Sequence, residues 1–179
     1  MSKPFWDLDE KNNYVQVPSL LYKTKYNIIV AYRNKAKTVE IFTYIDNLIR
    51  KLSRAIKYRL KNMTPRLRAG FKIFTDIHPL KHKLFELPIE SMFRGLNKPK
   101  YVHLNYDITP VGKDGRLRAR ERFVFFKIRN VNGKFLSVPE ITELVIHEIS
   151  HTAANHVKWR DDDHNSDYYA YYNYLMNLV

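Results

Sequence analysis

Residues 38–62 constrain the fold most strongly, because their apolar side chains recur at spacings of three and four. A pattern with this period predicts an amphipathic helix with a single buried stripe. The stripe consists of Val39, Phe42, Ile45, Ile49, Leu52, Ile56 and Leu60. The chain is therefore expected to form a long helix that packs on the rest of the domain through this stripe. The segment up to Pro18 shows no such pattern and predicts irregular structure.

Short segments rich in β-branched and aromatic residues predict a small sheet beside this helix. They are residues 26–32, 101–106 and 123–128. Asn132-Gly133 predicts a turn, and Pro139 is expected in the first turn of a second helix. A closing helix is expected over residues 166–178. With 179 residues the chain fits one α+β domain, whose small mixed sheet packs against the long helix and the second helix.

The charge balance predicts a polyanionic partner. Lys and Arg total 31 against 18 Asp and Glu, which gives a formal net charge of +13. Such a field attracts nucleic acid or an anionic membrane surface, although a lysine-rich bias of the source genome would produce the same number. Residues 50–72 contain no acidic side chain, whereas a solvated helix normally mixes both signs. The candidate nucleic-acid-binding residues are Arg50, Lys51, Arg54, Lys57, Lys61, Arg66 and Arg68, with Arg116, Arg118 and Arg120 of a second basic run.

The chain contains no cysteine, which excludes disulfides and thiolate metal sites. Any zinc must therefore be held by His, Asp or Glu. No apolar run approaches the roughly 20 residues that a membrane span requires, and residues 1–13 lack the apolar core of a secretory signal. We expect an intracellular protein that acts in the cytoplasm or nucleus. A viral protein that acts inside its host cell is part of this expectation.

Residues 147–151 read His-Glu-Ile-Ser-His and match the pattern H-E-x-x-H. Residues four apart on a helix are rotated by about 40° and separated by about 6 Å, so both imidazoles can reach one ion. The intervening glutamate can accept a proton from an attacking water, while zinc polarises the carbonyl under attack. The pattern predicts His147 and His151 as ligands of Zn²⁺ and Glu148 as the catalytic base. The alternative is a pair of surface histidines on an ordinary helix.

A catalytic zinc needs a third protein ligand and leaves its fourth position open. Glu148 is the last glutamate of the chain, so no downstream glutamate can complete the site. The remaining candidates are His156, His164, Asp161, Asp162, Asp163 and Asp167. If the helix continued, His156 would point about 180° away from His147. His164 follows a polar stretch that can fold back, and we favour it; His156 and the aspartates stay open.

Four stretches of this sequence carry a family resemblance. They are Gly95-Leu96-Asn97, Phe126-Lys127-Ile128-Arg129, residues 145–151 and residues 163–168. Over about residues 85–175 the chain resembles the WLM family of zinc metallopeptidases, relatives of the spartan and SprT-like proteases. In that family the third ligand is a His followed four places later by an aromatic, which corresponds to His164 and Tyr168. The interval between His151 and His164 is longer than in the family, which keeps His156 open.

The resemblance implies a zincin-like peptidase domain over residues 1–179, with a basic N-terminal half (1–80) and a catalytic half (85–179). It also implies proteolysis of proteins crosslinked to DNA, as in DNA repair, with DNA switching the protease on. Other readings are a zinc peptidase with no role on nucleic acid and a non-enzymatic basic DNA-binding protein with a structural metal site. A metal-dependent enzyme acting on other carbonyl compounds is a further alternative.

Overall fold

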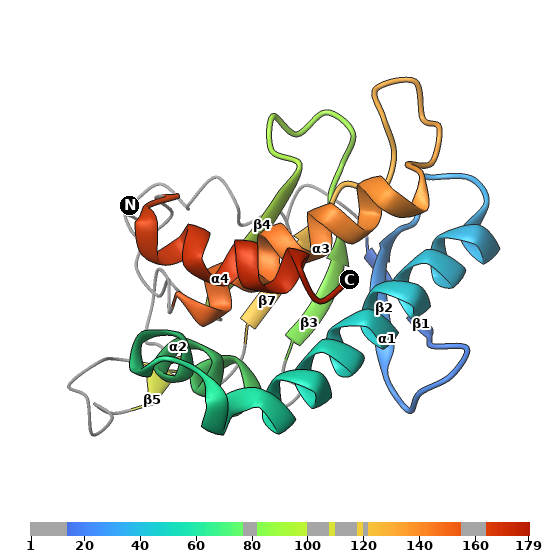
Figure 1. Cartoon of the computed structure of the whole chain (residues 1–179). Helices are drawn as coiled ribbons and strands as arrows, with labels where there is room; N and C mark the ends of the chain where they lie inside the picture. The colour runs from blue at the N-terminus through green and yellow to red at the C-terminus, as the bar shows by residue number, and fades with distance from the viewer. Residues whose placement is uncertain (1–13, 77–81, 100–107, 110–117, 120–121, 155–163) are drawn as a thin grey trace.

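The structure is a computed structural model, and it describes residues 14–76, 82–99, 108–109, 118–119, 122–154 and 164–179. The chain is α+β, as predicted (Figure 1). The strands are β1 (Tyr14–Pro18), β2 (Lys25–Ile29), β3 (His82–Glu86), β4 (Gly95–Pro99), β5 (Ile108–Thr109), β6 (Arg118–Ala119) and β7 (Arg122–Phe126). The helices are α1 (Lys35–Arg59), a 3-10 turn η1 (Leu60–Asn62), α2 (Pro65–Asp76), α3 (Val138–Ala153) and α4 (Ser166–Met176).

The main sheet is mixed and has five strands in the order β1-β2-β3-β7-β4. The pairs β2–β3 and β3–β7 are parallel, whereas β1–β2 and β4–β7 are antiparallel. The helices α1 and α2 connect the parallel strands β2 and β3, a connection that parallel pairing requires. Strands β5 and β6 form a separate two-stranded ladder. In the described part of the chain, β4 is thus an edge of the main sheet, and α3 packs beside it.

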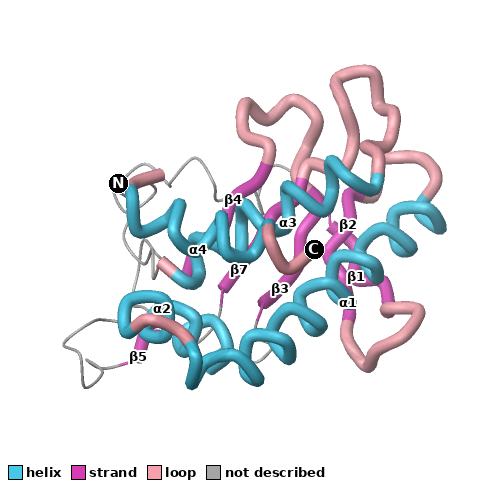
Figure 2. Tube along the Cα trace, in the orientation of Figure 1, coloured by secondary structure: helices cyan, strands magenta, loops and turns pink. Residues whose placement is uncertain are grey.

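The helices lie together over one face of the sheet (Figures 1 and 2). Alternate strand residues such as Leu84, Val124 and Phe126 join the main hydrophobic core on this face. Their neighbours Phe85 and Phe125 belong to a smaller cluster with Leu87 and Leu96. This is the period-two alternation of a strand. None of the helices in the described ranges has the length and apolar character that a membrane-spanning helix needs.

Helix α1 has the predicted stripe, because Val39, Phe42, Ile45, Ile49, Leu52 and Ile56 are all buried in the main core. The helix begins earlier than the expected Thr38. Asn34 is the N-cap in a left-handed conformation (φ 59°), and its side chain accepts a hydrogen bond from Lys37 N. Asparagine tolerates this conformation better than most residues. Thr38 instead lies buried in the first turn.

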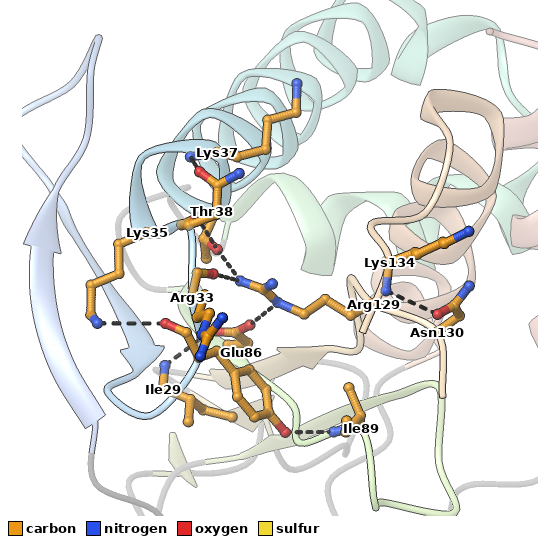
Figure 3. A network of polar contacts seen from close by, with 12 residues as sticks. Ile29, Arg33, Lys35, Lys37, Thr38, Glu86, Ile89, Arg129, Asn130 and Lys134 are labelled. Atoms are coloured by element: carbon orange, nitrogen blue, oxygen red, sulfur yellow. Dashed lines mark hydrogen bonds and ion pairs between the residues drawn. The ribbon is translucent and has the colours of Figure 1, made fainter. Parts of the chain in front are cut away.

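A buried ion pair joins the sheet to the start of α1 (Figure 3). Arg129 Nε donates to Glu86 Oε1 at 3.2 Å, and its terminal nitrogen donates to Thr38 Oγ1 at 2.8 Å and to Arg33 O at 2.7 Å. The other carboxylate oxygen of Glu86 accepts from Ile29 N at 2.9 Å. Burial raises the pKa of Glu86, and the Ile29 N–H and the Arg129 charge oppose that rise. The Arg129 of the resembling stretch is therefore a structural residue that fixes β3 against α1.

Candidate metal centre

Helix α3 starts at a residue that its own sequence specifies. Ser137 is the N-cap, and it forms a capping box in which Ser137 N donates to Glu140 Oε2 at 2.7 Å and Ser137 Oγ accepts from Glu140 N. Proline lies in the first turn, where it costs no hydrogen bond. The apolar face of α3, which includes Ile141, Val145 and Ile149, enters the main core. With the start and the buried face fixed, the rotation of α3 places its histidines in a cleft beside β4.

Three histidines converge at the cleft. His147 and His151 lie one turn apart on α3, and His164 lies just before α4, next to the N-cap Asn165. One ligand atom from each lies within 4.8 Å of the others, and the Nε2 atoms of His151 and His164 are 3.3 Å apart. Zinc–nitrogen bonds of about 2.0–2.1 Å in a tetrahedral site place two ligand nitrogens about 3.3 Å from each other. The His151 and His164 nitrogens have this spacing, and the three histidines together could hold a metal ion.

The protonation state of the first histidine suits a ligand. Burial lowers the pKa of His147, and the neighbouring His164 lowers it further. A lowered pKa keeps the imidazole neutral near pH 7, which is the form that binds a metal.

Glu148 is buried in the wall of the same cleft. Its side chain is 2% exposed, and its Oε1 lies 3.9 Å from His147 Nε2. Burial raises the pKa of Glu148 to about 8, and the charge of Lys98 opposes this rise. A divalent cation beside a carboxyl group favours its ionised form. Glu148 is thus a buried acidic group whose Oε1 lies beside the histidines of the cleft.

Gly95 makes room for this carboxyl group. A Cβ atom at position 95 would lie 2.7 Å from Glu148 Cδ and 2.9 Å from Glu148 Cγ, closer than real Cβ contacts. The missing side chain at position 95 therefore leaves the space that the Glu148 carboxyl group occupies beside β4.

Asn97 fixes the backbone of α3 from the sheet side. Its amide nitrogen donates to Glu148 O at 2.6 Å and to Thr152 Oγ1 at 2.8 Å, and its carbonyl oxygen accepts from Arg122 Nε at 2.6 Å. Asn97 and Arg122 are both buried. In the sequence, Gly95 and Asn97 stand out only through the family resemblance, which assigns them no role. The only sequence signal for these two residues is the short motif that contains them. The residue that both of them meet, Glu148, lies about fifty positions later in the chain.

The cleft has a volume of about 310 Å³. It is lined by Met92, Phe93, Arg94, Gly95, Leu96, Asn97, Lys98, Glu143, Leu144, His147, Glu148, His151 and His164. Arg94 and Glu143 link its two walls through a 3.3 Å ion pair, and Tyr172 on α4 donates to Glu143 at 3.0 Å. Apolar and charged residues therefore both line the cleft that contains the three histidines.

Among the other candidate ligands, Asp167 is described and is not one of the residues that line the cleft. Asp167 lies in the first turn of α4, where it accepts a 2.8 Å hydrogen bond from Arg66 Nε. His156 and residues 161–163 lie outside the described residues. His82, a histidine without a metal-ligand pattern in the sequence, is buried in β3 against Thr152, and burial lowers its pKa to about 3.

The predicted nucleic-acid-binding residues fall into three groups. Lys51, Arg54, Lys57 and Lys61 are exposed along α1 and η1. The other described members already have partners within the chain: Arg50 with Asp46 and the Tyr22 ring, Arg66 with Asp167, and Arg68 with carbonyls in η1 and just after it. Arg116 and Arg120 lie outside the described residues, and Arg118 is described only as part of the β6 backbone.

Comparison with known proteins gives only distant likenesses. No protein-family model matches the sequence, and no curated protein matches it. Among solved structures, the crystal structure of Wss1 from Saccharomyces cerevisiae aligns with a TM-score of 0.46 and 14% identity, over 84% of this chain and 83% of that chain. A mutant of Wss1 aligns with a TM-score of 0.45 and 13% identity, over 84% of both chains. The assignment of function therefore depends on the geometry of the cleft.

Proposed function

We propose that this chain is a zinc-dependent endopeptidase in which His147, His151 and His164 hold the ion and Glu148 is the general base. One observation carries the proposal: three imidazoles from two segments converge within 4.8 Å beside a buried carboxyl group in a shared cleft. A structural zinc site closes its coordination shell with four protein ligands. Here the described residues supply three, and they line a cleft, as a catalytic site requires.

A zinc ion held there would supply Lewis acidity, which lowers the pKa of water and polarises a peptide carbonyl. The remaining steps belong to the protein. The Glu148 carboxylate accepts the proton of the attacking water and then delivers it to the amine that leaves. Gly95 and Asn97 hold β4 and the Glu148 backbone at a fixed separation, so the carboxylate stays where the proton is transferred.

Protein is the substrate class that this cleft favours. The cleft runs beside β4, which is an edge strand of the main sheet among the described strands. An extended peptide can add to such an edge through main-chain hydrogen bonds. We propose that residues 1–179 form one metallopeptidase domain, whose catalytic half (85–179) contains the site and whose basic half (1–80) supports it.

Exposed cations on α1 and η1 support a further part of the proposal, that the substrates are associated with or crosslinked to DNA. Arg54 and Lys57 are three residues apart on α1 and therefore lie on one side of it, and Lys61 follows in η1. None of the three forms an ion pair that the described residues record, and the chain as a whole carries a net charge of +13. A phosphate backbone matches such a row of cations, and DNA repair is the process in which such a protease would act.

The test is cleavage of a fluorescently labelled basic protein by the purified zinc-loaded chain, with and without DNA. Glu148→Gln should retain the metal and lose at least about 100-fold in rate, because it removes the proton acceptor. Glu40→Gln, an exposed acid on α1, serves as the control and should cleave like the wild type. Zinc-loaded wild type that cleaves no protein, or a Glu148→Gln variant with wild-type rate, would contradict the proposal.

A further inference from the structure

Tyr168 on α4 contacts all three histidines of the candidate metal centre. The centroid of its ring lies 4.6 Å from that of His164, 4.7 Å from that of His151 and 5.6 Å from that of His147. Among the described residues, no other aromatic ring outside the triad makes contacts with all three. Tyr168 is 1% exposed, although His164 beside it is exposed. Its ring is therefore a buried surface against which the imidazoles pack.

The hydroxyl of Tyr168 fixes the same residue to α3. It donates a 2.9 Å hydrogen bond to the backbone oxygen of His147. The backbone of Tyr168 is fixed as well, because its N–H donates to the N-cap side chain of Asn165 at 3.0 Å. One side chain thus connects the segment that carries His164 to the helix that carries His147 and His151.

This connection matters because the triad is assembled from separate parts of the chain. His147 and His151 have positions fixed by α3, whereas His164 precedes α4 and follows residues 155–163, which lie outside the described part of the chain. Ligands bind a metal tightly only when groups around them hold their rings in the correct orientation, and losing such a group typically costs about 10- to 100-fold in affinity. Within the described residues His164 is joined directly to α4, and Tyr168 is the residue of α4 whose ring contacts the other two histidines.

We propose that Tyr168 is the positioning residue of the metal centre: its ring orders the three imidazoles, and its hydroxyl sets the distance between α4 and α3. This inference rests on the proposed zinc site and adds a role for a residue that neither binds the ion nor exchanges a proton. The hydroxyl is engaged with the His147 carbonyl, so Tyr168 acts through the histidines.

The experiment compares zinc affinity in variants of Tyr168 with matched variants of Tyr171. Tyr171 lies on the same helix and is 3% exposed, and its hydroxyl also donates to a backbone oxygen, that of Arg66 at 3.2 Å. Its ring packs on Gly70 and Phe71 of α2, away from the triad. The dissociation constant for zinc is measured by competition with a chromophoric chelator, and the cobalt(II)-loaded proteins are compared by visible absorption.

Tyr168→Leu should weaken zinc binding at least about tenfold and change the cobalt spectrum. Tyr168→Phe, which keeps the ring, should weaken binding about fivefold. Tyr171→Leu and Tyr171→Phe should lower the thermal midpoint of the apoprotein but keep the wild-type zinc affinity and spectrum. Wild-type zinc affinity in both Tyr168→Phe and a folded Tyr168→Leu would overturn the positioning role of Tyr168 while leaving the proposed function intact. A wild-type chain that binds no zinc would overturn both this inference and the proposed function.

Discussion

Adding one methyl group at Gly95 should displace the general base without removing it. In Gly95→Ala the new Cβ would lie 2.7 Å from Glu148 Cδ, whereas carbon atoms in contact prefer about 3.5–4.0 Å. The Glu148 carboxyl group must therefore move by about 1 Å. A displacement of about 1 Å at a catalytic group typically costs about 100-fold in rate. We expect kcat/KM to fall by about that factor, because β4 is held by its ladder to β7 and cannot retreat.

The assay is peptide cleavage under kcat/KM conditions, accompanied by zinc stoichiometry and thermal unfolding. Zinc content should stay at the wild-type level, because the substitution touches none of the three histidines. Gly133→Ala is the control: Gly133 has φ +79° and no atom within 4 Å of the added Cβ, so it should lose stability by about 1 kcal/mol but keep its activity. A Gly95→Ala enzyme with wild-type kcat/KM would show that the position of Glu148 is not set by β4.

Three further outcomes follow from the buried and charged groups. Arg129→Met leaves Glu86, 1% exposed, without its cation, and should cost about 3–5 kcal/mol in urea unfolding; a loss below about 1 kcal/mol would contradict the structural role of the pair. Because burial lowers the pKa of His82 to about 3 from 6.5, the unfolded chain binds the extra proton first as pH falls. The free energy of unfolding should therefore fall below pH 6.5 more steeply in the wild type than in His82→Gln, by up to about 1.4 kcal/mol per pH unit. The same dependence of unfolding free energy on pH in both proteins would refute this. Replacing Arg54, Lys57 and Lys61 by Gln should reduce the slope of log K against log salt for double-stranded DNA by up to about 0.9 per lost contact; an unchanged slope would exclude that face as the interface.

Sequence reasoning predicted the elements whose burial follows a simple period. The stripe of α1 and the capped start of α3 are specified by local patterns, and the structure has both. The strand expected over residues 123–128 is β7, which begins one residue earlier and ends at Phe126. The strand expected over residues 26–32 is β2, which ends at Ile29. The turn at Asn132-Gly133 is present, with Gly133 at positive φ. The expected strand over residues 101–106 lies outside the described residues.

The elements that were not predicted from the sequence are of different kinds. Some bury polar as well as apolar side chains, and one was interpreted only as a positively charged segment. Strands β3 and β4 bury His82, Glu86 and Asn97, so buried polar side chains break the expected alternation of apolar and polar residues. The segment up to Pro18 was expected to be irregular, which is wrong for Tyr14–Pro18: these residues form the short strand β1. Helix α2 was read only as a basic stretch, although Thr64 and Pro65 are a recognisable helix start. Local propensity cannot show which distant segments such polar residues meet.

In the candidate site, too, some features follow from local sequence and others depend on the packing of distant segments. The spacing of His147 and His151 is a local property of a helix, and it was readable from five residues. His164 was favoured over His156 and the aspartates partly by resemblance. Its place near the other two histidines depends on the packing of α4 against α3, through residues such as Tyr168 that no local pattern assigns. The role of His164 as a ligand is a prediction that only metal binding can test.

Zinc stoichiometry of the purified wild type, His164→Ala and His156→Ala tests the central claim most directly. The proteins are purified without chelator, resupplied with zinc, desalted and measured by elemental analysis. We predict about one zinc per chain in the wild type and in His156→Ala, and none retained in His164→Ala. No zinc in the wild type, or full zinc retention in His164→Ala with loss in His156→Ala, would contradict the assignment of the metal centre.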